Sequence, residues 1–194
     1  MHQEISTQRQ KNLKIIHVAL FTALIAVGAF IKIPVPYLDY FTLQFFFVIL
    51  SGMLLGSKLG ALSVGIYVIM GLIGIPIFAA GGGLGYVLRP SFGFLLGFIV
   101  AAFVCGKICE IFKHKKYYHY LIAALGGFIA TYSLGLLYKY FILNVYLNQI
   151  VPWFIVVISA FPLDIPGDLL LCILAALTGL KLDKLNVGRI NTNK

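Results

Sequence analysis

Long apolar runs, separated by short turns that are polar or rich in glycine and proline, are the main pattern along this chain of 194 residues. A helix needs roughly 20 apolar residues to cross the hydrocarbon layer of a bilayer. The apolar stretch from Lys14 to Leu180 has room for six such runs with turns between them. The pattern therefore predicts an all-α integral membrane protein with six transmembrane helices.

The turns set the bounds of the predicted spans. We expect the spans at 15–33, 42–55, 61–77, 91–111, 121–143 and 153–180. The second is short for a span, and Pro162 and Pro166 interrupt the first half of the sixth, because proline removes a backbone donor and clashes with the preceding turn. Loops are expected on one side at 34–40, 78–90 and 144–152, and on the other at 56–60 and 113–119.

Composition rules out a water-soluble domain. Hydrophobic residues make up 61% of the chain, charged residues only 11%, and the mean hydropathy is +0.99, so too few polar side chains are present to cover a soluble surface. No long polar segment indicates a second domain. We expect one membrane domain over 1–194, with a cytoplasmic N-terminal segment at 1–14, a six-helix bundle at 15–180 and a basic tail at 181–194.

The net charge is +9, and the basic residues lie at the termini and in short loops, as they do in membrane proteins. They do not form the continuous basic patch that a nucleic-acid-binding surface requires. Twelve Lys and Arg residues fall on the side of the termini, and Lys32 and Arg89 fall on the other, with Lys139 inside a span. Because basic residues are retained on the inner side, both termini are predicted to be cytoplasmic. The twelve are Arg9, Lys11, Lys14, Lys58, Lys107, Lys113, Lys115, Lys116, Lys181, Lys184, Arg189 and Lys194.

The three cysteines, Cys105, Cys109 and Cys172, lie in apolar segments without histidines at zinc-ligand spacing. An odd number of cysteines inside a membrane does not build a disulfide framework, so we expect them to pack as small apolar residues. No metal ion or cofactor is predicted.

Four ionisable residues lie where the membrane should be, and each is a candidate site residue because a charge in lipid needs a cavity or a partner. Asp164 and Asp168 stand four residues apart, so they share a face if that stretch is helical. Arg89 lies on the predicted outer side. Lys139 lies within the fifth span, where we interpret it as a snorkelling or pairing residue.

Two interpretations of the outer charges remain open. Asp168 and Arg89 could bind a small zwitterionic or anionic molecule with an apolar body, or they could form an internal salt bridge that holds helices together. Gln44, Asn144 and Tyr86 add hydrogen-bonding capacity nearby.

The glycine run at 81–85 also has two interpretations. Gly82, Gly83 and their neighbours allow close backbone approach and positive φ, as a ligand-binding loop requires, or the run is simply a flexible outer loop. It is not a phosphate-binding loop, since no Gly-Lys-Ser/Thr follows. The chain is therefore not expected to hydrolyse ATP by itself.

Small residues stand four apart in the first span, at Ala19 and Ala23. A small-x-x-x-small pattern lets another helix approach closely. The partner is either a helix of another protein or a helix of this bundle.

Together these segments resemble the substrate-binding S components of energy-coupling factor (ECF) vitamin transporters, and specifically the biotin-binding BioY family. The resemblance covers nearly the whole chain. It is carried by Gly71-Leu-Ile-Gly-Ile-Pro-Ile-Phe78, the glycine loop with Tyr86, Pro90-Ser-Phe-Gly-Phe-Leu-Leu-Gly-Phe98 and Ile165-Pro-Gly-Asp168. Ala19-x-x-x-Ala23 is similar to the first-helix motif by which S components dock on the coupling subunit.

The resemblance implies a six-helix bundle in the bacterial plasma membrane, with a biotin pocket near the extracellular side closed by the loop after span one and the glycine loop. It implies transport, not catalysis, with an ECF transmembrane coupling subunit and two ATP-binding subunits as partners. Asp168 would bind the polar head of biotin, since a carboxylate can accept both N–H groups of a ureido ring. Arg89 would bind the ureido carbonyl or the valerate carboxylate. The expected substrate-binding residues are Asp168, Arg89, Tyr86, Gly82, Gly83, Gln44, Asp164 and Asn144.

The sequence departs from the family pattern at two places. The family usually carries a lysine three residues after the Pro-Gly-Asp aspartate, and here that residue is Leu171. The usual Gly-Pro-Thr-Gly-Gly-Tyr is altered to Arg89-Pro-Ser-Phe-Gly-Phe94. Either Arg89 takes over the role of the missing cation, or the ligand is another small carboxylate such as lipoate.

A rival from another class is an intramembrane aspartyl protease that uses Asp164 and Asp168. Such an enzyme needs two carboxylates that share a proton, and known types place them on separate helices, whereas here both lie on one segment. A second rival is a membrane scaffold that transports nothing.

Overall fold

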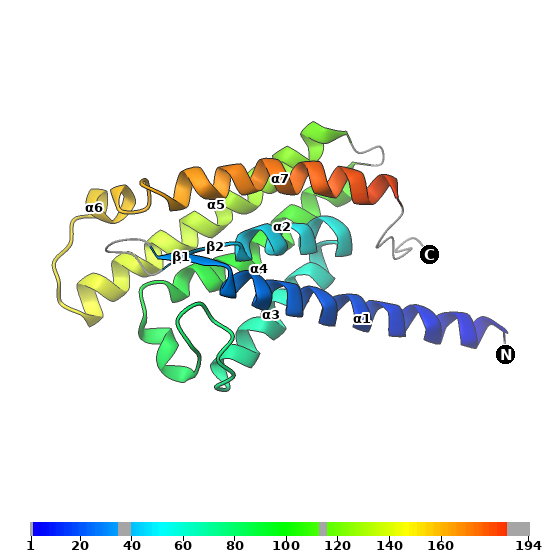
Figure 1. The fold of residues 1–194 in the computed structure, drawn as a ribbon, viewed down its shortest axis with the longest axis horizontal. Coiled ribbons are helices and arrows are strands. Elements are labelled where there is room, and N and C mark those ends of the chain that lie inside the picture. Colours follow the sequence, from blue (N-terminus) through cyan, green and yellow to red (C-terminus); the bar gives the residue numbers. More distant parts are fainter. Residues whose placement is uncertain (1, 35–39, 113–115, 186–194) are drawn as a thin grey trace.

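The computed structural model describes residues 2–34, 40–112 and 116–185 as a bundle of helices (Figure 1). The helices are α1 (His2–Phe30), α2 (Gln44–Leu55), α3 (Ser57–Leu72), α4 (Phe92–Ile111), α5 (Tyr117–Phe141), α6 (Trp153–Ile158) and α7 (Asp164–Lys184). Short elements join them: an antiparallel hairpin of β1 (Lys32–Pro34) and β2 (Tyr40–Thr42), a 3-10 turn η1 (Leu84–Leu88) and a π turn η2 (Ile142–Tyr146).

Four helical segments are long and apolar enough to cross a membrane, namely those at 8–30, 92–111, 117–146 and 164–184. The helices α2 and α3 are apolar but shorter, with 12 and 16 residues. At a rise of about 1.5 Å per residue they reach about 18 and 24 Å, less than the roughly 30 Å of a hydrocarbon core. The prediction of an all-α membrane protein is confirmed, with four long apolar helices and two shorter ones.

Several predicted spans have the wrong bounds, and the third and the fifth differ most clearly. The third was expected to reach Ile77, but α3 ends at Leu72, and the chain turns at Gly74, whose φ of 108° favours glycine. The fifth begins at Tyr117 and, through η2, continues to Tyr146, inside the loop expected at 144–152.

The sixth predicted span, 153–180, is two helices in the structure. A one-and-a-half-turn helix, α6, ends at Ile158, and after a turn α7 begins at Asp164. Pro166 lies in the first turn of α7, where backbone N–H groups have no partner within the helix and proline is tolerated. Asp164 and Asp168 therefore lie one turn apart on a single continuous helix.

The expected loops fall partly outside the described residues. This applies to 35–39 in the loop after span one, to 113–115 in the loop after span four, and to 186–194 in the basic tail.

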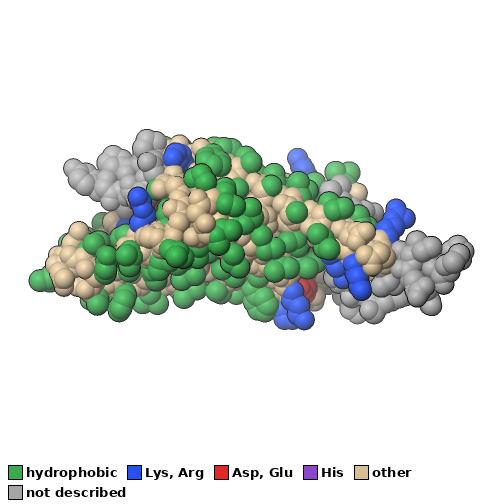
Figure 2. Space-filling model, turned by 90° about the horizontal axis from the view of Figure 1, so that it is seen from below, with side chains coloured by type: hydrophobic (Ala, Val, Ile, Leu, Met, Phe, Trp, Pro, Cys, Tyr) green, Lys and Arg blue, Asp and Glu red, His purple; other side chains and the backbone are tan. Residues whose placement is uncertain are grey.

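The helices pack through small residues at their crossing points. A Cβ added to Gly52 of α2 would lie 2.4 Å from the carbonyl oxygen of Ala102 on α4, and one added to Gly60 of α3 would lie 2.8 Å from Cα of Gly52. Such close approaches matter in a membrane because lipid tails are as apolar as the side chains. The hydrophobic effect therefore does not drive helices together there, and close backbone packing does. Apolar side chains cover much of the face drawn in Figure 2, and the Lys and Arg side chains visible on it stand in separate small groups along its length.

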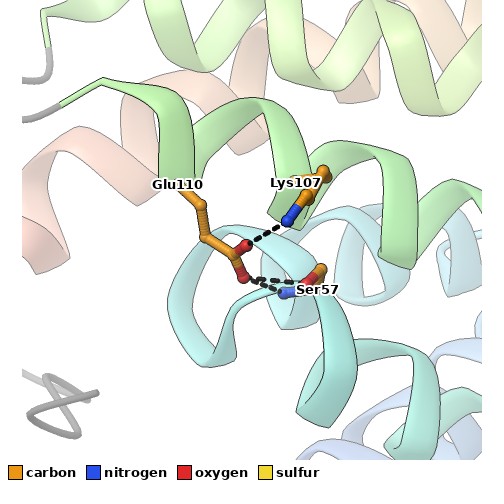
Figure 3. A network of polar contacts seen from close by, with 3 residues as sticks. All are labelled: Ser57, Lys107 and Glu110. Atoms are coloured by element: carbon orange, nitrogen blue, oxygen red, sulfur yellow. Dashed lines mark hydrogen bonds and ion pairs between the residues drawn. The ribbon is translucent and has the colours of Figure 1, made fainter. Parts of the chain in front are cut away.

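Glu110 near the end of α4 ties that helix to the start of α3 (Figure 3). Its Oε1 accepts hydrogen bonds from the backbone N–H and the hydroxyl of Ser57, both at 2.8 Å, and its Oε2 lies 3.6 Å from Nζ of Lys107. The carboxylate thus caps the N-terminus of α3 from a neighbouring helix, where a negative charge is stabilising.

The two ends of the bundle differ in what they carry. In Figure 1 the start of α1 and the end of α7 lie at the same end of the molecule, and the β1–β2 hairpin, η1 and α6 lie at the other. The start of α7, which carries both aspartates, is therefore at the end opposite the start of α1.

Candidate ligand-binding cavity

A cavity of about 550 Å³ lies within the bundle near the hairpin, η1 and α6. This volume is in the range of small-molecule sites. The start of α2, the first turn of α4, the end of α5, α6 and the start of α7 all contribute to its wall. Its lining consists of Phe41, Thr42, Gln44, Phe45, Ala79, Tyr86, Pro90, Ser91, Phe94, Leu95, Phe98, Tyr132, Lys139, Leu143, Gln149, Val151, Ile155, Val156, Ser159, Asp164 and Asp168.

Asp168 is the most buried charged group in this wall, with 9% of the residue exposed. The hydroxyl of Tyr132 on α5 donates a hydrogen bond to its Oδ2 at 2.9 Å. A buried carboxylate needs hydrogen-bond donors to offset its desolvation, and Tyr132 supplies one. The bond also fixes the orientation of the carboxylate toward the cavity.

Asp164 lines the same cavity one helical turn earlier and is half-buried. The sequence prediction that the two aspartates share a helix face is confirmed. Because both are on α7 and only Asp168 receives the Tyr132 bond, they occupy different environments and do not form a symmetric pair.

Two buried polar atoms in the wall have no hydrogen-bond partner among the described residues, Nε2 of Gln44 and Oγ of Ser91. Gln44 is 3% exposed and opens α2 directly after the hairpin. Buried polar groups are nearly always paired. Gln44 and Ser91 therefore bring polar groups into the cavity wall, although the two atoms themselves are covered, and the Gln44 amide lies near the hydroxyl of Tyr67.

Tyr86 in η1 also lines the cavity, and contacts with a row of aromatic rings hold it there. Its ring packs on Phe78 at 4.6 Å between centroids, and Phe78 packs on Tyr67 at 5.4 Å. The guanidinium of Arg89 lies over the Tyr86 ring, with Cζ 5.3 Å from the centroid. Arg89 itself is exposed and is not part of the cavity lining.

The glycines shape the loop that carries Tyr86 and do not line the cavity. Gly83 has a φ of 99°, and its N–H donates to the carbonyl of Gly71 at 2.7 Å. A Cβ on Gly82 would meet the carbonyl oxygen of Ile75 at 2.4 Å. Both positions need glycine for the fold of the loop.

Asn144 lies outside the lining and closes the loop after η2. Its amide nitrogen donates to the carbonyls of Tyr140 and Val151 at 3.0 Å, and its Oδ1 accepts from the N–H of Val151 at 2.8 Å. The side chain thereby holds the segment that carries Gln149 and Val151 against the cavity.

The structure thus brings Asp168, Asp164, Gln44 and Tyr86 together and leaves Arg89, Gly82, Gly83 and Asn144 at the periphery. The sequence analysis did not identify Tyr132 and Ser159. A neutral tyrosine or serine costs little free energy inside a membrane, so its presence in an apolar run does not indicate a site. Lys139 was interpreted as a snorkelling or pairing residue; its Nζ donates to Oγ of Ser159 at 2.9 Å, and its side chain lines the cavity. The spacing of seven residues from Tyr132 to Lys139 is the signal that could have placed the two on one face of α5.

A second, apolar groove of about 450 Å³ runs between α1 and α3. Ala19 and Ala23 are exposed in it, with Thr22 between them. The hydroxyl of Thr22 lies 2.9 Å from the carbonyl oxygens of both Val18 and Ser63, and its single proton, shared between them in a bifurcated hydrogen bond, joins the two helices.

Comparison with known proteins connects this architecture to one group of proteins. A family model described as "BioY family" matches residues 1–186. A probable biotin transporter BioY from Lysinibacillus sphaericus is 42% identical, over 91% of this chain and 90% of the relative. The biotin transporter BioY from Thermotoga maritima is 41% identical, over 91% of this chain and 99% of the relative.

A solved structure shares the fold. The S component for biotin from an ECF-type ABC transporter superposes with a TM-score of 0.79 at 28% sequence identity, covering 91% of this chain and 93% of the other.

Proposed function

The chain belongs to the BioY family, and from this membership we propose that it is the biotin-binding S component of an ECF-type ABC transporter. It is a multi-pass membrane protein of a transporter family, and it is not an enzyme. The rival interpretation of Asp164 and Asp168 as a protease pair is therefore wrong.

The observation that supports this function most directly is Asp168, a buried carboxylate held by Tyr132 in the wall of the cavity. The ureido ring of biotin has two N–H donors and one carbonyl acceptor. Asp168 would accept from the N–H groups, since a carboxylate has about four lone-pair sites and Tyr132 uses one. Gln44, another residue of the wall, would turn its amide toward the ureido carbonyl and donate to it.

The apolar part of the ligand would pack on the aromatic wall. Phe94, Phe98 and Tyr86 line the cavity on its α4 and η1 side, and burial of apolar surface favours binding by about 25 cal/mol for each Å² removed from water. Gly82 and Gly83 would act by shaping the loop that carries Tyr86, and Asn144 by holding the loop after η2.

We expect the short helices α2 and α3 to complete six membrane-crossing segments with the four long helices. On the count of basic residues, both termini would face the cytoplasm, which puts the cavity toward the extracellular side. The protein would then capture biotin outside the cell and release it inside.

Energy for uptake would come from partner proteins: an ECF transmembrane coupling subunit and two ATP-binding subunits. The exposed Ala19 and Ala23 in the α1–α3 groove are the proposed contact with the coupling subunit, because small side chains let a partner helix approach closely.

A titration of purified protein in detergent with biotin, and separately with lipoate, by isothermal calorimetry tests this function. We expect biotin to bind tightly and lipoate weakly, because lipoate has no N–H donors for Asp168. Binding of lipoate without biotin would retain the S-component fold but change the substrate, as the Leu171 departure allows. Binding of neither would contradict the proposed function.

A further inference from the structure

Lys139 is a cation inside the membrane-spanning part of α5, and its side chain lines the ligand cavity. The Nζ donates to Oγ of Ser159 at 2.9 Å, and that hydroxyl donates in turn to the carbonyl of Val156 at 2.7 Å. The two bonds hold the ammonium at the wall formed by α6. A snorkelling lysine would extend to the interface, whereas this one is half-buried beside the cavity.

The cavity has polar groups at two levels along α5. Tyr132, which holds Asp168, and Lys139 are seven residues apart, so they lie on the same face of the helix at levels separated by about 10 Å. Phe94 lies between the levels: its ring packs where a Cβ of Gly135 would be, and it makes an edge contact with Tyr132 at 5.7 Å between centroids. An acceptor, an apolar stretch and a cation therefore follow one another along the cavity.

This order matches a ligand with a hydrogen-bond donating head, an apolar middle and an anionic tail. On the basis of the proposed function, we propose that Lys139, supported by Ser159, binds the carboxylate of the ligand and makes the site selective for an ionised tail.

The charges facing the cavity strengthen this assignment. Asp164 and Asp168 both line it, and Lys139 is the cationic side chain in the lining. Lys139 also interacts electrostatically with Asp164, so a ligand carboxylate would share this cation with Asp164. Without Lys139 it would meet two negative groups, and like charges repel strongly where water is excluded. Arg89, the other candidate cation, is exposed and lies over the Tyr86 ring outside the lining.

The test compares biotin with its primary amide, biotinamide, which has the same head and chain but no charge. Affinities of both ligands are measured by calorimetry for the wild type, Lys139→Gln, Lys139→Arg and Arg89→Gln. Lys107→Gln, an exposed lysine of α4 paired with Glu110 away from the cavity lining, is the matched control.

We expect the wild type to prefer biotin over biotinamide. In Lys139→Gln, biotin should weaken roughly 10- to 100-fold, as for a charge-assisted hydrogen bond, while biotinamide changes little, so that the preference disappears. Lys139→Arg should retain most of the preference, and Lys107→Gln all of it.

Equal losses for both ligands in Lys139→Gln would overturn the inference and assign Lys139 a structural role. Loss of the preference in Arg89→Gln instead would overturn it in favour of Arg89. Failure of the wild type to bind either ligand would overturn the proposed function, and the role of Lys139 with it.

Discussion

At the residue scale, the site depends on how one buried carboxylate is supported. Asp168 stands out in the sequence because a charged aspartate in an apolar run is costly unless it faces a cavity or a partner. Its supporting donor, Tyr132, lies 36 residues away on another helix, and tyrosines are common in membrane segments. The free-energy cost of a charge in an apolar run could therefore indicate the proposed binding residue from the sequence. The tyrosine that orients it could be found only from the fold.

The choice between Lys139 and Arg89 as the cation of the cavity also required the fold. Both are cations near the predicted outer side, and the sequence favoured Arg89 because it adjoins the glycine loop. The structure puts Lys139 in the cavity lining because its side chain lies on the same face of α5 as Tyr132, whereas Arg89 follows η1 on the exposed side. Which face of a helix meets the cavity depends on the packing of the other helices, and hydropathy does not give it.

Replacement of Asp168 by Asn tests the head-group contact. The asparagine Oδ1 can still accept the Tyr132 bond, so the fold should persist, but the amide nitrogen presents a donor to the ureido N–H groups. We expect biotin affinity to fall roughly 10- to 100-fold by calorimetry. Asp164→Asn is the matched variant and should have a smaller effect; an unchanged affinity in Asp168→Asn would contradict the assignment.

At the element scale, the sequence located the four long apolar helices and the two shorter ones, but not every helix end. Long apolar runs predict spans because lipid forces the backbone to satisfy its hydrogen bonds within a helix. Proline was harder to interpret: Pro166 was expected to break a span, but it lies in the first turn of α7 and is compatible with a helix there. The close helix crossings could not be predicted, because glycine alone does not reveal its neighbour.

The crossing of α2 and α4 at Gly52 gives a stability prediction. Gly52→Ala puts a methyl group 2.4 Å from the Ala102 carbonyl oxygen, which the backbone can relieve only by moving apart. We expect a loss of about 1–3 kcal/mol, as for overpacking, seen as a lower midpoint of thermal unfolding in detergent.

The matched control for Gly52→Ala is Gly65→Ala in α3, where an added Cβ meets nothing within 4 Å. Alanine has the higher helix propensity, so this variant should be neutral or more stable. Equal midpoints for the two variants would show that the close crossing does not limit stability.

At the scale of the whole molecule, the ligand cavity and the α1–α3 groove have no lining residue in common. The cavity lies at the end with α6 and η1, and the α1–α3 groove with Ala19 and Ala23 lies along the side of the bundle. Composition alone predicted a membrane bundle, and motif resemblance predicted the family. The resemblance already assigned docking to the first span and binding to later segments, but neither it nor the composition could show that the cavity and the groove have separate linings.

This separation predicts that docking can be lost while binding is kept. The double variant Ala19→Leu and Ala23→Leu fills the groove with larger side chains but touches no residue of the cavity lining. We expect unchanged biotin affinity in detergent and a loss of uptake of labelled biotin in cells that also produce the coupling and ATP-binding subunits.

Ser133→Leu, an exposed small-to-large change on α5, controls for a general effect of added bulk on the lipid-facing surface. It should retain uptake. Normal uptake by the Ala19 and Ala23 variant would remove the groove from the proposed docking surface.

The central claim is that biotin occupies this cavity with its ureido head on Asp168 and its carboxylate toward Lys139. A crystal structure of the protein with biotin tests it most directly. We predict ligand density between α4, α5 and α7, with the ureido nitrogens at hydrogen-bond distance from Asp168. Biotin bound elsewhere, or with its carboxylate at the Asp168 end, would contradict the account.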